Sequence, residues 1–229
     1  LSHKDNVELN LINFYQNQHL KEILKILQDS FLKDEKKSEN IAKIEIIFFN
    51  ILDWEDMICT RKLLEKKTDL YCELIKILFL DKNNQSSNLE IENKQRTKAI
   101  FNLFNKIKFC PSPKNLKKWF DELQKKLEIQ NQSHLFYHIL GNLLPYSAIG
   151  KDGYVPCEEA RDIIENNYND DLKNSYICTE LNKRGIYSNS AGKEEKKIAE
   201  KYKENSNAIR TLYPFTAKIY DDLSEKYKI

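Results

Sequence analysis

Two histidines lie four residues apart in the segment HLFYH, so His134 and His138 would point to the same side of a helix. Zinc metalloproteases use this spacing, but they need a glutamate directly after the first histidine, and Leu135 stands there. A metal site would have to recruit Cys157 or a carboxylate from elsewhere in the fold. We therefore expect the two histidines to be structural or surface residues, and we expect no bound metal or other cofactor.

Cys157 is the best candidate for a nucleophile, because it begins an expected helix, where the helix dipole lowers the pKa of a thiol. An enzyme hypothesis would assemble Cys157 with His134 and His138 in space. The same position suits a small side chain that packs behind Pro156. The cysteines are odd in number, widely spaced and without a CxxC pair, which favours reduced and mostly buried thiols. They are Cys59, Cys72, Cys110, Cys157 and Cys178.

Other familiar catalytic patterns are missing. The segment Gly150–Gly153 (GKDG) lacks both the preceding strand and the spacing of a phosphate-binding loop, so it predicts a turn. No arginine is followed four to six residues later by a histidine, which argues against a metal-independent helical ribonuclease. Acidic pairs such as Glu158-Glu159 are adjacent in sequence and diverge around a helix, unlike an acid/base pair. We therefore expect that the chain is not an enzyme.

The loop after Gly185 is the best candidate for partner contacts. Its side chains are polar and adaptable, and we expect Arg184, Tyr187 and Asn189 to touch a protein partner. All five glycines fall between 141 and 192, so this region is the expected recognition edge. The alternative for the loop is a plain connection between helices.

The most basic expected helix carries Lys114, Lys117, Lys118 and Lys125 close to Trp119. These lysines form the alternative hypothesis, nucleic-acid binding, although the net charge of only +2 gives no general electrostatic footprint for it. They would also suit an acidic protein, or form a solvated face behind which the aromatic residues are buried.

The fold class follows from the breakers of regular structure, because the first 110 residues contain neither glycine nor proline. Apolar residues recur at spacings of three and four, and nothing alternates with the period of a strand. We expect an all-α fold, an irregular helical-repeat-like array of antiparallel helix pairs. The expected helices are 7–15, 19–32, 39–52, 54–66, 70–80, 93–109, 114–129, 134–144, 157–167, 170–184, 193–212 and 215–227.

Within this array, Ser38 is expected to cap a helix whose part 41–52 is the most buried of the N-terminal half. The polar segment 81–92 predicts a loop, and Gly185 suits a helix C-cap. The Cys110–Pro113 break predicts two helical subdomains, 1–110 and 111–229, and the alternative is one continuous domain. No apolar run is long enough to span a membrane and no signal peptide is evident, so we expect a cytoplasmic protein.

The C-terminal 160 residues carry two specific motifs, Asn-x-Arg-Gly at 182–185 and a Tyr-Pro-x-Thr-Ala corner at 213–217. With the segments around them, they resemble the C-terminal part of large, uncharacterised helical proteins of bacteria. That resemblance implies a helical fold and no activity or catalytic residue. The chain also begins without Met and ends inside a helical pattern, so we expect a piece of a longer protein.

Together these patterns predict a non-enzymatic interaction, sensing or scaffold module of a larger bacterial cytoplasmic protein. Its partner would be another protein, or other domains of the same longer chain. Binding of nucleic acid through the lysine-rich helix is the alternative.

Overall fold

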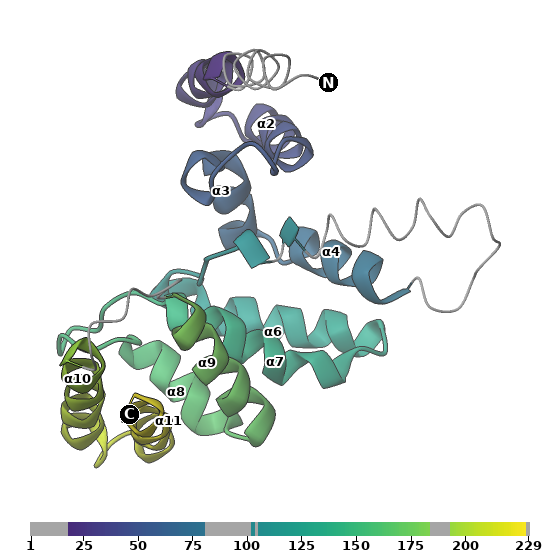
Figure 1. Ribbon diagram of the computed structural model, residues 1–229. Helices are drawn as coiled ribbons and strands as arrows, with labels where there is room; N and C mark the ends of the chain where they lie inside the picture. Colours follow the sequence, from purple (N-terminus) through teal and green to yellow (C-terminus); the bar gives the residue numbers. More distant parts are fainter. Residues whose placement is uncertain (1–17, 81–101, 104, 184–192, 228–229) are drawn as a thin grey trace, which may run out of the picture. The chain divides into compact units, whose positions relative to one another are not determined.

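The computed structural model describes residues 18–80, 102–103, 105–183 and 193–227 (Figure 1). Among these residues every regular element is a helix, which confirms the all-α class. The chain divides into two compact units, 1–108 and 109–229, where the sequence suggested a boundary after residue 110. The expected helix 7–15, the loop 81–92, most of the helix 93–109 and the Gly185 cap lie outside the described residues.

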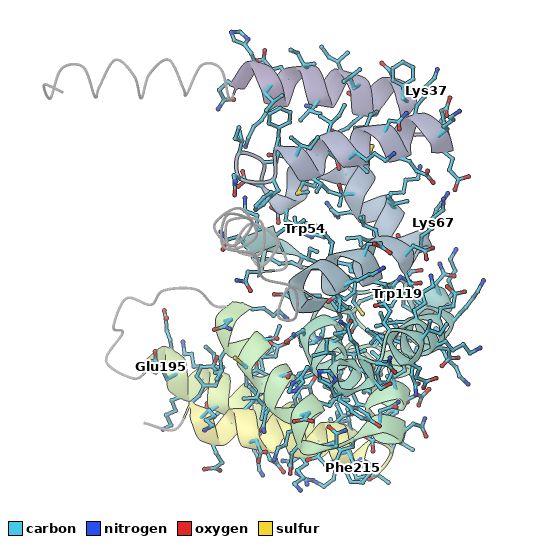
Figure 2. The ribbon with its side chains drawn as sticks, turned by 90° about the vertical axis from the view of Figure 1, so that its right-hand side faces the viewer. Lys37, Trp54, Lys67, Trp119, Glu195 and Phe215 are labelled. Carbon is cyan, nitrogen blue, oxygen red and sulfur yellow. The ribbon has the colours of Figure 1, made fainter. Side chains whose placement is uncertain are left out.

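The first unit begins with a helix over residues 18–31. It continues with α2 (Glu35–Ile47), the 3₁₀ turn η1 (Trp54–Asp56), α3 (Ile58–Lys66) and α4 (Asp69–Leu80). Its core contains Leu24, Ile41, Met57 and Leu64. Trp54, labelled in Figure 2, is buried as well, and its indole nitrogen donates to the carbonyl of Lys108 at 2.8 Å.

Two predictions about α2 are wrong. The helix begins at Glu35 instead of after Ser38, because the Asp34 side chain accepts a hydrogen bond from the Lys37 amide and caps it. It ends at Ile47, which is 70% exposed, so the segment 41–52 is not a single helix. The buried face instead carries the charged residue Glu45.

The second unit contains α6 (Pro113–Ile129), η2 (Ser133–Leu135), α7 (Phe136–Leu143) and η3 (Leu144–Tyr146). It continues with α8 (Glu158–Asn167), α9 (Asp170–Lys183), α10 (Lys193–Ile209) and α11 (Pro214–Lys226). In Figure 1, α8 and α9 lie between α6 and α7 on one side and the α10/α11 pair on the other. Apolar residues at three- and four-residue spacings turn one face of each long helix inward, as the sequence predicts.

Neighbouring helices pair in both directions. In α10 and α11, Ser206 bonds to the carbonyl of Ala217 and Ser224 bonds to that of Ala199, so these helices run antiparallel. In α7 and α9, by contrast, His138 meets Ser175 and Asn142 meets Thr179, so both helices run the same way. The parallel arrangement is possible because α8 lies between them in sequence and returns the chain to its starting end.

Gly141 explains why α7 and α9 pack so closely. A Cβ atom at this position would lie 2.4 Å from the carbonyl oxygen of Leu172 and 2.8 Å from the backbone nitrogen of Tyr176. Only glycine therefore allows the two backbones to approach this far. The close crossing also brings the polar side chains of α7 and α9 into hydrogen-bonding range.

Candidate functional site

The main candidate site is an open groove of about 530 Å³ between α9 and α11. Lys173 of α9 reaches across the groove to α11. Its amino group lies 3.3 Å from a carboxylate oxygen of Asp170 and 3.7 Å from one of Asp222. The wall formed by α9 contains Lys173, Asn174, Ile177, Cys178 and Leu181. The wall formed by α11 contains Asp222, Glu225 and Lys226. The groove thus combines an apolar strip with charged groups of both signs.

Cys178 places an accessible thiol in this groove. Cys59, Cys72 and Cys157 are buried, whereas the side chain of Cys178 is exposed. Cys110 is half-buried, and loss of solvation raises the pKa of its thiol well above the ordinary value. A reagent reacts with a thiolate that it can reach, so Cys178 should be the first of these cysteines to be modified.

A second surface is the outer face of α6. Lys114, Lys117, Lys118 and Lys125 are all exposed there, as expected of a face that contacts solvent or a partner. The opposite face of α6 is buried and includes Trp119, which is labelled in Figure 2. The Trp119 ring makes edge contacts with Phe109 and Phe120. The sequence therefore predicted both faces of this helix.

The partner-contacting residues expected from sequence cannot be placed. Arg184, Tyr187 and Asn189 lie in the segment 184–192, outside the described residues. Their place in the chain is informative nevertheless, because α9 ends at Lys183 and Leu181 lines the groove. The expected contacts therefore follow the groove wall directly along the chain.

The structure gives His138 partners other than Cys157. Its Nδ1 lies 3.0 Å from the Ser175 hydroxyl oxygen, and its Nε2 lies 3.8 Å from a carboxylate oxygen of Asp171. His134 is exposed in η2. Within the described part of the chain, no three His, Cys, Asp or Glu side chains form a group that could hold a metal ion.

The contact chain of Ser175, His138 and Asp171 contains the residue types of a hydrolase triad. Acyl transfer also needs hydrogen-bond donors for the developing oxyanion. Ser175 lies in the interior of α9, where helical hydrogen bonds occupy the backbone amides around it. The same side of α9 bonds to α7 again through Thr179. We therefore interpret the three residues as part of a polar seam between the helices.

The nucleophile hypothesis for Cys157 meets a physical obstacle. Cys157 is the N-cap residue of α8, as the sequence suggested, but its side chain is buried. Loss of solvation on burial is the largest influence and raises the pKa of the thiol. This is the opposite of the lowering expected from the helix terminus, so burial outweighs the helix dipole here.

The GKDG segment forms a turn, as expected, with Gly153 at φ +85°. Sequence reasoning missed the side chain that holds this turn. Arg161 of α8 is completely buried, its Nη2 lies 2.7 Å from Asp152, and its guanidinium carbon lies 4.6 Å from the centre of the Tyr213 ring. A charged residue amid the apolar positions of α8 was the available signal. Arg161 thus joins the turn to the corner before α11.

Comparison of the chain with protein-family models, curated proteins and solved structures gives no match. Among the described helices, none is long and apolar enough to cross a membrane. The site is therefore interpreted from its own geometry alone.

Proposed function

We propose that the chain is a non-enzymatic helical interaction module that binds a protein partner, within a larger bacterial cytoplasmic protein. The observation that carries this proposal is the open groove between α9 and α11. A domain of the same longer protein would be as suitable an occupant of the groove as a separate protein. Arg184, Tyr187 and Asn189, which follow the α9 wall along the chain, are the proposed contacts.

The dimensions of the groove favour a protein segment as its ligand. Its α9 wall runs from Lys173 to Leu181, which at 1.5 Å per residue is about 12 Å. That length fits two turns of a partner helix or a few extended residues. Ile177 and Leu181 on the α9 wall offer apolar contacts. Glu225 and Lys226 on the α11 wall offer charged groups. Grooves of this composition suit amphipathic segments, whose apolar face enters and whose charges stay at the rim.

The test uses the exposed thiol as a reporter. A photo-crosslinker attached to Cys178 should capture a discrete protein from extract of the native cells. In the matched control, Cys178→Ser is combined with Gln124→Cys on the exposed face of α6, and the crosslinker is moved there. We expect the capture to be lost in this control. Replacing Arg184 and Tyr187 by Ala should weaken the capture while the melting temperature stays nearly unchanged. Equal capture from both crosslinker positions would refute the proposal.

Nucleic-acid binding through α6 is the second candidate function. It is supported by the exposure of Lys114, Lys117, Lys118 and Lys125 along one helix. Binding of this kind should weaken steeply with salt, because each phosphate contact releases counterions. Retention on heparin at low salt is its minimum requirement.

A further inference from the structure

We infer that the outer face of the hairpin formed by helix 18–31 and α2 binds a second copy of this chain, so that two chains form a symmetric dimer. The inference goes beyond the proposed function, because its surface and its partner both differ from those of the α9–α11 groove. All the residues involved belong to the first unit.

Three large apolar side chains are exposed on this hairpin. Ile23 and Ile26 of helix 18–31 are 56% and 65% exposed, and Ile47 of α2 is 70% exposed. Single apolar residues are normal on a protein surface, whereas a contiguous apolar patch marks an interaction site. The positions of the three isoleucines on neighbouring helices therefore decide what they mean.

The two helices lie side by side and run in opposite directions (Figure 2). The side chain of Gln28 donates to Glu45 at 2.8 Å, and the amino group of Lys37 lies 4.5 Å from the centre of the Phe31 ring. Moving up helix 18–31 thus means moving down α2. The first half of helix 18–31 is consequently level with the second half of α2.

This packing brings the isoleucines together on the outer face. Ile26 lies two residues before Gln28, and Ile47 lies two residues after Glu45, so the two isoleucines are level with each other. Gln28 and Glu45 are both buried. Two residues correspond to about 200° around a helix, so both isoleucines point away from that buried pair. Ile23 is one turn from Ile26 and extends the patch.

The two helices carry the same spacing pattern with opposite charges. Residues 22–26 are Glu-Ile-Leu-Lys-Ile, and residues 43–47 are Lys-Ile-Glu-Ile-Ile. In both segments a charged residue is followed by isoleucine at the next position and again three positions later. The leading charge is acidic in the first segment and basic in the second. Of these six side chains, Ile44 is half-buried and the other five are exposed.

A two-fold axis converts this pattern into complementary contacts. Because the helices are antiparallel within one chain, an axis through the outer face lays helix 18–31 of one copy parallel to α2 of the other. Residues 22–26 can then face residues 43–47 of the second copy, each opposite the position 21 places later. That register pairs the carboxylate with the lysine and the isoleucines with one another, and the symmetry repeats every contact. The face is thus complementary to itself, which is the property that a dimer interface requires.

The contact that Glu22 makes within its own chain does not compete strongly. One of its oxygens lies 3.6 Å from Nδ1 of His19, and the two side chains are 71% and 75% exposed. Ion pairs this exposed contribute little. Glu22 therefore stays accessible to a lysine of a second copy.

The size of the face sets the expected strength of the dimer. Helix 18–31 and α2 are each about 20 Å long, and two helices side by side are about 20 Å wide. Such a face is small beside the roughly 800 Å² that each partner buries in a standard interface. We therefore expect a dissociation constant in the micromolar range.

The first experiment measures the mass of the full chain by light scattering and sedimentation over a series of concentrations. The mass should rise from one chain to two and stop there. Ile26→Ser/Ile47→Ser should raise the dissociation constant at least tenfold, because each chain loses two apolar contacts. The matched control is Ile129→Ser, which replaces an isoleucine that is 82% exposed on α6 and should dimerise as the parent does. All three positions are exposed, so circular dichroism should show unchanged helix content.

The second experiment tests the charge pairing by exchange. Glu22→Lys alone and Lys43→Glu alone should each weaken the dimer about tenfold at low salt, because like charges then face each other twice. An equimolar mixture of the two variants should recover the parent affinity, since each new lysine then meets a new glutamate or a native one of opposite sign. Recovery on mixing cannot arise from a contact within a single chain.

A chain that stays monomeric at high micromolar concentration overturns the inference and leaves the face to another domain of the longer protein. An equal loss of dimer in Ile129→Ser would place the interface elsewhere, and growth beyond two copies would exclude a closed two-fold pair. Failure of the mixture to recover would refute the proposed register. None of these results touches crosslinking through Cys178, which reports on the groove and decides the proposed function separately.

Discussion

Glu45 in the first unit and Arg161 in the second are both fully buried charged side chains, and they are accommodated in opposite ways. Both oxygens of Glu45 accept hydrogen bonds, from the Gln28 side chain at 2.8 Å and from the backbone amides of Cys59 and Thr60 at 3.0 and 2.7 Å. Arg161 is held by the carboxylate of Asp152 and lies over an aromatic ring. Backbone amides stabilise the Glu45 carboxylate, whereas a counterion stabilises the Arg161 guanidinium.

The difference follows from what each charge needs. The two amides that bind Glu45 belong to the first turn of α3, whose N-cap residue Met57 supplies no side-chain hydrogen bond. A carboxylate from α2 therefore caps α3 from outside and also meets its positive dipole end. Glu165 does the same for α11, accepting from the amides of Phe215 and Thr216. A buried cation is a donor and needs acceptors: Lys106 donates to the backbone carbonyls of Phe49 and Leu52, whereas Arg161 donates to the carboxylate of Asp152.

The largest expected effect comes from removing Arg161. Arg161→Met should lower the free energy of unfolding by about 3 kcal/mol, because it breaks an ion pair whose cation is buried. The loss should not be larger, because the Asp152 side chain is 38% exposed and solvent partly stabilises its unpaired carboxylate. Urea denaturation followed by circular dichroism measures this value. The matched control is Arg210→Met, which removes a half-exposed arginine bound to Asp221 and should cost less than about 1 kcal/mol. Equal losses would show that burial of Arg161 adds nothing.

A somewhat smaller effect is expected at the buried anion. Glu45→Gln keeps the shape but turns an amide group toward donors, so one backbone N–H of α3 loses its acceptor. The cost should be about 2 kcal/mol, as for hydrogen bonds that involve a charged group. Glu165→Gln is the comparison, since it alters the same kind of cap at a half-buried position and should cost less. Stabilities of the two variants in urea settle the order, and the reverse order would contradict this account of the caps.

The contrast between these charges also shows how far sequence reasoning reaches. Amphipathic spacing places the α6 lysines outside and Trp119 inside without knowledge of the fold, because both sides of that decision are local. Glu45 and Ile47 resist such reasoning, since the buried carboxylate satisfies a helix start elsewhere in the chain. The parallel packing of α7 and α9 depends on a close contact between Gly141 and Leu172. These residues are far apart in sequence, so no local pattern predicts the contact. The partner contacts proposed for Arg184, Tyr187 and Asn189 are argued from the sequence, since these residues lie outside the described part of the chain.

The smallest expected effect concerns acid, and it tests the counterion of Arg161. Burial raises the pKa of Asp152, but hydrogen bonds from Arg161 and from the Tyr154 amide outweigh it, so the pKa is lowered below its ordinary value. A carboxyl with a lowered folded-state pKa stabilises the fold above its unfolded pKa of about 4, and that contribution is lost as the pH falls through the folded value. The stability difference between the parent and Asp152→Asn should therefore be constant near neutral pH and shrink below about pH 4. Urea denaturation at a series of pH values measures it. A difference that persists unchanged into strong acid would mean that Asp152 contributes packing and not charge, and that the buried guanidinium is held chiefly by the Tyr213 ring.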